Sequence, residues 1–170
     1  TGEIVARMDE WKLLPRDAVV LDIGCGIGRL ERALSQRVRR IIGTDVSNGM
    51  IAEAQRRCAD LPNVSLSVCN GRDLADFAGE RVDLVVAVDS FPYVFAADPA
   101  LVTRHVKDAR ALLKRGGALL ILNFSYRADR DADVADVNRL AREHDFTVQR
   151  AGTRDFRVWD GLTFLLRAKP

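Results

Sequence analysis

Short apolar runs alternate with amphipathic segments along most of the chain, and this alternation limits the possible folds more than any other feature. The apolar runs are typical of strands buried on both faces, whereas the segments between them repeat apolar residues at helical spacing. Strands that alternate with helices form βαβ units, in which right-handed crossovers build a parallel sheet. We expect strands at 18–23, 40–45, 64–69, 82–88 and 118–124, and helices at 3–14, 28–37, 48–59, 99–114 and 131–144.

The residues after 144 depart from this alternation. Two strand-like stretches, 146–151 and 162–168, flank the turn residues Trp159-Asp160-Gly161. Their short separation favours an antiparallel hairpin over another crossover. The sequence therefore predicts an α/β fold, a three-layer αβα sandwich around a doubly wound, mostly parallel, seven-stranded sheet with an antiparallel C-terminal hairpin strand.

We expect the whole chain, residues 1–170, to form a single domain, because its length suits one domain of about 100–200 residues. A leading helix lies in 1–14, the alternating core in 18–124 and the hairpin in 145–170. Hydrophobic residues make up 48% of the chain and charged residues 29%, which excludes a disordered or collagen-like protein.

Charge and cysteine pattern exclude further classes of function. The 26 basic and 24 acidic residues leave a net charge of +2, so neither nucleic acid nor a membrane surface is an expected partner. No membrane span or signal peptide is visible, and we expect a cytoplasmic protein. Cys25, Cys58 and Cys69 form no C-x-x-C pair, so no metal site is predicted. His105 and His144 are expected on helices, away from the ligand-binding edge, as surface or boundary residues.

A glycine-rich loop, Asp22–Gly28, follows the first predicted strand. Ligands of parallel sheets bind outside the carboxyl ends of the strands, where glycines let the backbone approach closely and a helix N-terminus offers free N–H groups. The spacing is G-x-G-x-G. It departs from the dinucleotide fingerprint G-x-G-x-x-G/A because Arg29 stands at the third glycine position, and no P-loop pattern is present.

The second predicted strand ends in Asp45. A carboxylate at this strand end can accept hydrogen bonds from both hydroxyls of a ribose, although taken alone it could equally be a solvated strand-end residue. The loop and Asp45 together indicate an adenosine-containing cofactor that needs no pyrophosphate pocket.

Four segments carry a resemblance to a known family: Val20–Gly28, Gly43–Met50, Asp83–Val86 and Leu112–Ile121. In their residues and their order along the chain, they resemble the class I S-adenosylmethionine-dependent methyltransferases. The resemblance covers about residues 18–124. It implies an enzyme that binds S-adenosyl-L-methionine and releases S-adenosyl-L-homocysteine.

The resemblance also implies roles for the glycine loop. The backbone of Gly24, Cys25 and Gly26 would line the methionine part of the cofactor, and Asp22 would help to hold its amino group. The thiol of Cys25 is expected to act as a small apolar wall.

Residues after the second and third strands would bind the adenosine part. The resemblance gives the ribose to Asp45 and places Met50 against the adenine, with a core position as the alternative for Met50. Asn70 would accept a hydrogen bond from the adenine amino group, since an amide oxygen can replace the family's usual carboxylate, and Gly71 follows it. The alternative register gives this role to Asp73.

Methyl transfer requires chiefly that the nucleophile and the methyl group be held about 3 Å apart and aligned, and a general base is optional. After the fourth strand, Asp89 and Tyr93 should border the transferable methyl group and are the candidate catalytic residues. Capping or wall duty is the alternative for each. Asn123–Tyr126, after the fifth strand, offers another face of the same pocket.

The methyl acceptor is predicted by elimination. No [DNS]-P-P-[YFW] pattern follows the fourth strand, which argues against methylation of nucleobase exocyclic amines, and no Pro-Cys pattern follows it, which argues against methylation of cytosine C5. The Lys-Asp-Lys-Glu set of ribose 2′-O methylation is not found either. A small-molecule acceptor remains. Two other functions stay open: a silent module that holds the cofactor without turnover, and a nucleotide-dependent oxidoreductase. The oligomeric state is open as well.

The acceptor site has little visible cover in the sequence. No sizeable insertion follows the fifth strand, and only one short helix precedes the first. We therefore expect either a shallow, open site or a cover supplied by residues before Thr1 or by a partner chain.

Overall fold

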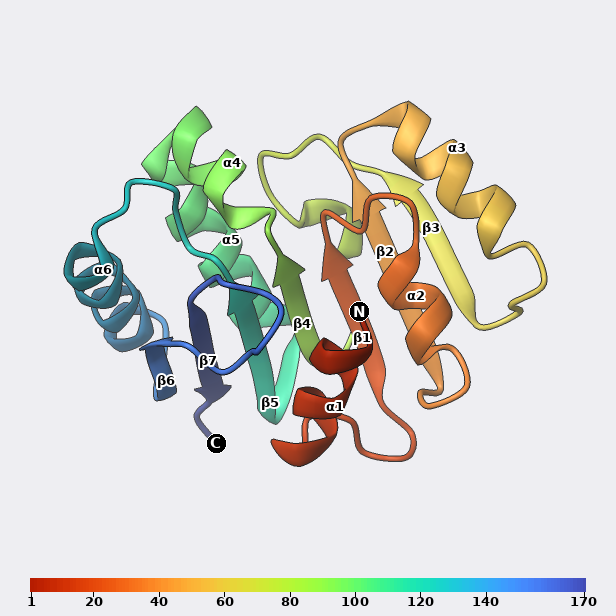
Figure 1. The fold of residues 1–170 in the computed structure, drawn as a ribbon. Helices are drawn as coiled ribbons and strands as arrows, with labels where there is room; N and C mark the ends of the chain where they lie inside the picture. The colour runs from red at the N-terminus through yellow and green to blue at the C-terminus, as the bar shows by residue number, and fades with distance from the viewer.

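The computed structural model describes residues 1–170 and shows a seven-stranded sheet with strand order β3-β2-β1-β4-β5-β7-β6, layered between helices (Figure 1). The strands are β1 (Val19–Ile23), β2 (Arg40–Asp45), β3 (Val64–Val68), β4 (Val82–Val88), β5 (Leu113–Leu122), β6 (Phe146–Thr153) and β7 (Thr163–Ala168). The helices are α1 (Gly2–Glu10), α2 (Arg29–Leu34), α3 (Asn48–Arg57), α4 (Phe91–Ala97), α5 (Pro99–Leu112) and α6 (Arg130–Glu143), with a short 3₁₀ helix, η1 (Ala75–Phe77).

The predicted α/β sandwich is confirmed. Strands β3, β2, β1, β4 and β5 pair in parallel, and β7 pairs antiparallel with both β5 and β6. The hairpin strand β7 thus enters the sheet between β5 and β6 as the antiparallel element that the sequence predicts.

Two apolar cores lie on opposite faces of the sheet. Side chains of α1 and α2 pack on one face, and those of η1, α5 and α6 pack on the other. In β1, Leu21 belongs to the α5 core and Val20 to the α2 core, as the two-residue period of a strand requires. Burial on both faces explains why the strands are short apolar runs rather than alternating ones.

The strand order reverses between β1 and β4. The crossover after β1 leads to β2 on one side, whereas β4 pairs on the other side of β1. The loops that leave β1 and β4 therefore turn apart and open a crevice at the carboxyl ends of these strands, the usual ligand site of doubly wound sheets.

Several helices and strands begin or end at other residues than predicted. Helix α5 ends at Leu112, and the glycine pair that was expected to stop it lies inside the irregular start of β5, where the register with β4 shifts between Val82 and Leu84. Gly116 adopts φ +70 there, which lets the strand bend. Helix α1 ends at Glu10 instead of running to residue 14, and α2 ends at Leu34 instead of residue 37.

Two short helices were not predicted. Helix α4 begins next to Pro92. Proline suits the first turn of a helix, because N–H groups there have no partner within the helix and the N–H that proline lacks is not needed. The second, η1, has only three residues and no room for a periodic pattern. None of the helices combines the length and the apolar character that crossing a membrane requires.

Candidate functional site

Two adjoining clefts lie at the carboxyl ends of β1, β2 and β4. The larger, of about 550 Å³, is called the main cleft, and the smaller, of about 360 Å³, the side cleft. Both are lined by Gly24, Gly26, Met50, Val88 and Asp89, so they adjoin along these residues, and together they are called the depression. The depression occupies the crevice where the strand order reverses.

The glycine loop forms the floor between the clefts. Gly24, Gly26 and Gly28 have φ values of +79, +55 and +77, which side chains rarely tolerate. A Cβ at Gly24 would lie 2.4 Å from the Cβ of Ser90, so the ends of β1 and β4 approach closely there. A Cβ at Gly26 would meet no atom within 4 Å. The backbone of Gly26 therefore faces open space that a ligand can fill.

Asp45 is held at the edge of the main cleft. Its Oδ2 accepts a hydrogen bond from the N–H of Gly26 at 3.0 Å, and its Oδ1 accepts one from the N–H of Ser47 at 2.9 Å. The carboxylate is half-buried, and each oxygen keeps lone-pair capacity for a further donor. It can accept further hydrogen bonds from a ligand in the main cleft.

Met50 lies between the two clefts. Its side chain is 45% exposed, which excludes the core position that was the alternative. An exposed thioether beside a cleft offers a flexible apolar surface to a planar ring.

The loop after β3 brings Asn70 and Gly71, but not Asp73, to the main cleft. Asp73 lines a separate depression beside α5. The Oδ1 of Asn70 accepts hydrogen bonds from the N–H groups of Arg72 at 2.6 Å and Asp73 at 3.3 Å, so this oxygen shapes its own turn. The position of Asn70 thus favours this residue over Asp73 for the contact with the adenine.

Asp22 lines the side cleft from the end of β1, although its side chain is buried. Its Oδ1 has no hydrogen-bond partner. Burial, and then the neighbouring Glu31 carboxyl, raise the pKa of Asp22 well above its usual value. The sequence reasoning missed Glu31, whose place inside the amphipathic pattern of a helix carries no signal of a second buried acid.

Asp89 follows β4 and is fixed by two side chains from distant segments. Asn123, at the end of β5, donates from Nδ2 to Oδ1 at 2.5 Å, and Trp159, from the β6–β7 loop, donates from Nε1 to Oδ2 at 3.0 Å. Asp89 and Asn123 have φ values of +56 and +67. Such strain at non-glycine residues is concentrated at functional sites. The sequence reasoning treated Trp159 only as part of a turn.

Two tyrosines form an aromatic rim near Asp89. Tyr93 is 69% exposed and packs edge to face against Tyr126, with 5.9 Å between the ring centroids. Burial, and then the nearby Asp89 and Tyr93, raise the pKa of Tyr126. Tyr93 thus borders the main cleft, as predicted for a residue after the fourth strand.

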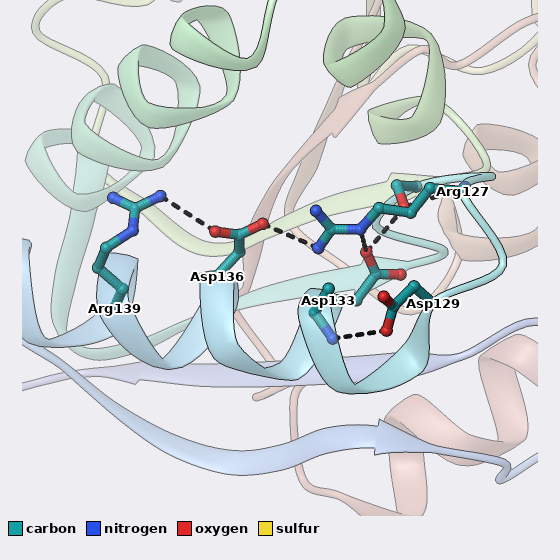
Figure 2. A network of polar contacts seen from close by, with 7 residues as sticks. Arg127, Asp129, Asp133, Asp136 and Arg139 are labelled. Atoms are coloured by element: carbon teal, nitrogen blue, oxygen red, sulfur yellow. Dashed lines mark hydrogen bonds and ion pairs between the residues drawn. The ribbon is translucent and has the colours of Figure 1, made fainter.

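An ion-pair network holds the β5–α6 loop that carries Tyr126 (Figure 2). Arg127 donates to Asp133 at 2.7 Å and to Asp136 at 2.8 Å, and Asp136 also pairs with Arg139 at 3.4 Å. Asp129 caps α6 by accepting from the N–H of Ala132 at 2.9 Å. The guanidinium of Arg127 also lies 4.9 Å from the centroid of the Phe95 ring on α4. The loop is thereby joined to both neighbouring helices.

The prediction for His105 is wrong. This histidine is 2% exposed and lines the main cleft, and its Nδ1 lies 2.8 Å from the carbonyl oxygen of Leu101. Leu101 and His105 lie one turn apart on α5, and both line the main cleft. His144, at the end of α6, lines neither cleft.

Helix α1, at the N-terminal end of the chain, lies against the β6–β7 loop beside the depression (Figure 1). Glu3 on α1 accepts hydrogen bonds from the N–H groups of Arg157 at 2.6 Å and Val158 at 3.2 Å. Thr1 and Ile4 line the side cleft. Helix α1 thus covers one side of the side cleft, where it contacts the β6–β7 loop.

The family model of a methyltransferase domain matches residues 20–117 of this chain. Among curated proteins, the putative methyltransferase YqeM of Bacillus subtilis is 24% identical and aligns with 92% of this chain and 68% of its own length. A ubiquinone biosynthesis O-methyltransferase of Azorhizobium caulinodans is 35% identical over 59% of this chain and 35% of its own length. The chain thus spans only about a third of one relative and two thirds of the other.

Solved structures show the same fold. The YcgJ protein of Bacillus subtilis superposes over 100% of both chains with a TM-score of 0.78 at 14% identity. Magnesium protoporphyrin IX methyltransferase of Synechocystis, solved with bound S-adenosylmethionine, superposes with a TM-score of 0.73 at 21% identity, over 99% of this chain and 77% of its own.

Proposed function

The chain belongs to the methyltransferase domain family and is an S-adenosylmethionine-dependent methyltransferase, and we propose that its acceptor is a small molecule bound where β4 and β5 end. The observation that carries this proposal is that the two clefts adjoin at Asp89, so that Asp22, Asp45 and Asp89 lie along neighbouring clefts at the carboxyl ends of three strands. An acceptor at Asp89 therefore meets a cofactor held by the other two carboxylates.

The residues present fit S-adenosylmethionine. The carboxyl group of Asp22 lines the side cleft and forms no ion pair, which suits a cationic amino group, and the open space at Gly26 suits the adjoining methionine chain. Asp45 accepts the ribose hydroxyls, while Met50 and Gly71 bound the adenine. Asn70 faces the adenine edge, and Cys25 narrows the side cleft beside the methionine part.

When bound, S-adenosylmethionine would supply a methyl group on its sulfonium; an acceptor lone pair would form the new bond to that carbon, and neutral S-adenosylhomocysteine would be the leaving group. Asp89 orients the acceptor through the lone pairs that Asn123 and Trp159 leave free, and it receives the acceptor proton directly or through water. Tyr93 borders the acceptor from α4, with Tyr126 packed against its ring. Alignment is thus the main contribution of the protein.

An oxygen acceptor is the first to test, because relatives named as ubiquinone biosynthesis O-methyltransferase and magnesium-protoporphyrin O-methyltransferase resemble this chain. Small phenols, carboxylic acids and amines are incubated with methyl-labelled S-adenosylmethionine, with RNA, DNA and a protein extract as parallel arms. We expect label in a small molecule. Transfer only to a macromolecule would overturn the proposal.

A thermal shift with S-adenosylhomocysteine separates binding from turnover in the same experiment. A shift without transfer to any acceptor would favour a silent cofactor-binding module. Asp89→Asn provides the matched variant, because the amide keeps the shape but cannot take a proton. We expect it to bind S-adenosylhomocysteine normally and to lose transfer.

A further inference from the structure

Glu31 is buried completely beneath the glycine loop, and neither of its carboxyl oxygens has a hydrogen-bond partner. It projects from α2 over β2, where a Cβ at Gly43 would lie 2.5 Å from Glu31 Oε1. Gly43 pairs in register with Asp22 on β1. The missing side chain at Gly43 therefore creates the space in which the Glu31 carboxyl lies beside that of Asp22.

No cationic side chain neutralises this pair. Neither carboxyl forms an ion pair, and Arg32 on the same helix is engaged with Asp60 at 2.8 Å. The other titratable groups around the pair are the Cys25 thiol in the loop, Asp45 at the end of β2 and the Cys58 thiol after α3. All of these are neutral or negative, so they cannot compensate a second buried charge.

Burial without a counter-charge favours the protonated form of a carboxyl group. The pKa of Glu31 is raised to about 7 by burial, and that of Asp22 is raised well above its usual value by burial and by Glu31. The two acids titrate as one unit. In the cofactor-free protein at neutral pH, the pair thus holds at least one proton between its carboxyl groups.

We propose that Asp22 and Glu31 form a proton-sharing pair, and that the ammonium group of the cofactor displaces the shared proton to solvent when it binds. This inference rests on the proposed function, which brings that ammonium group to Asp22. Glu31 is then a positioning residue. It touches Asp22 and not the cofactor, and it supplies the second negative charge that appears only on binding.

The sign of the effect follows from linkage. Because the bound state holds fewer protons than the free state, affinity rises with pH as long as the free pair is protonated. Between pH 6.0 and 7.0 the ligand amino group is already protonated and releases nothing itself. S-Adenosylhomocysteine should therefore bind more tightly at pH 7.0 than at pH 6.0, by several-fold and by at most about tenfold for one proton.

Calorimetric titration of the intact protein at pH 6.5, in two buffers that differ in ionisation enthalpy, counts the protons released. S-Adenosylhomocysteine is compared with 5′-methylthioadenosine, which keeps the adenosine thioether but lacks the amino group. We expect release with the first ligand and none with the second. Equal release with both, or binding without release, would overturn the inference. No binding of either ligand would contradict the proposed function as well.

Glu31→Gln removes the titrating carboxyl group of residue 31 and keeps the shape of its side chain. Glu143→Gln, on the exposed surface of α6, is its control. We expect Glu31→Gln to release fewer protons than wild type when it binds S-adenosylhomocysteine, and its affinity to rise less from pH 6.0 to 7.0, because only the buried Asp22 still titrates. The control should behave as wild type. Unchanged release in a folded Glu31→Gln protein would disprove the role of Glu31, and the wild-type comparison of two ligands decides the matter if that variant does not fold.

Discussion

The two halves of the depression are built in different ways. On the cofactor side, Asp45 is held by the backbone N–H groups of Gly26 and Ser47, within one βαβ unit. On the acceptor side, Asp89 is held by side chains 34 and 70 residues away in the sequence. The first half depends on local backbone geometry, whereas the second depends on the packing of distant segments. Substitutions should therefore separate cofactor binding from turnover.

The largest effect is expected at Asp45. Asp45→Ala removes two charge-assisted hydrogen bonds to the ribose, each worth about 1.5–3 kcal/mol, so S-adenosylhomocysteine affinity should fall at least about 100-fold. Titration calorimetry measures the change. Asp73→Ala is the control, because its carboxylate lies outside the main cleft. Equal losses in both variants would show that the cofactor side is not built around Asp45.

The buried Glu31 on the cofactor side should lower the free energy of unfolding as pH rises. Because folding raises the pKa of Glu31 from 4.5 to about 7, the folded protein binds this proton more tightly than the unfolded chain, and that contribution is lost between these pH values. Glu31→Gln should therefore be more stable than wild type at pH 7.5 by up to about 3 kcal/mol, and not at pH 4.5. Urea unfolding at both pH values tests this, and a constant difference would contradict it.

The acceptor side should respond to loss of its ion-pair network. Arg127→Gln leaves the buried Asp133 without its cation and should lower the free energy of unfolding by about 2 kcal/mol. The exposed partner Arg139 provides the control, and Arg139→Gln should cost less than about 0.5 kcal/mol. Chemical unfolding with equal m-values measures both. Cofactor affinity should stay unchanged in each, and a loss of it would break the distinction between the two halves.

The smallest effect is expected at the β6–β7 loop. Trp159→Phe keeps an aromatic ring beside Phe156 but removes the N–H that holds Asp89. Losing one hydrogen bond to a charged group should lower kcat about tenfold, with S-adenosylhomocysteine affinity unchanged within about twofold. Steady-state kinetics and binding are compared on the same preparation. A change confined to KM would mean that Trp159 contacts the acceptor and does not position Asp89.

The features that could be predicted from the sequence lie mainly on the cofactor side of the depression. The loop Asp22–Gly28 and Asp45 are close in sequence, and their positions depend on glycine φ angles and strand ends that residue types reveal. The buried place of His105, the bond between Trp159 and Asp89, and the cover formed by α1 could not be predicted. Each depends on how a loop or short helix packs against elements far along the chain, where residue spacing carries no signal.

The sequence by itself determined the α/β sandwich and the cofactor motif, because strand burial, helical periodicity and glycine spacing are local properties of the chain. Only the tertiary structure decided that Glu31 lies beside Asp22, that Asn70 and not Asp73 reaches the main cleft, and that Asp89 is fixed from two distant segments. The physical reason is that burial and charge pairing depend on distances in space, which are set when the sheet closes and its two faces are packed.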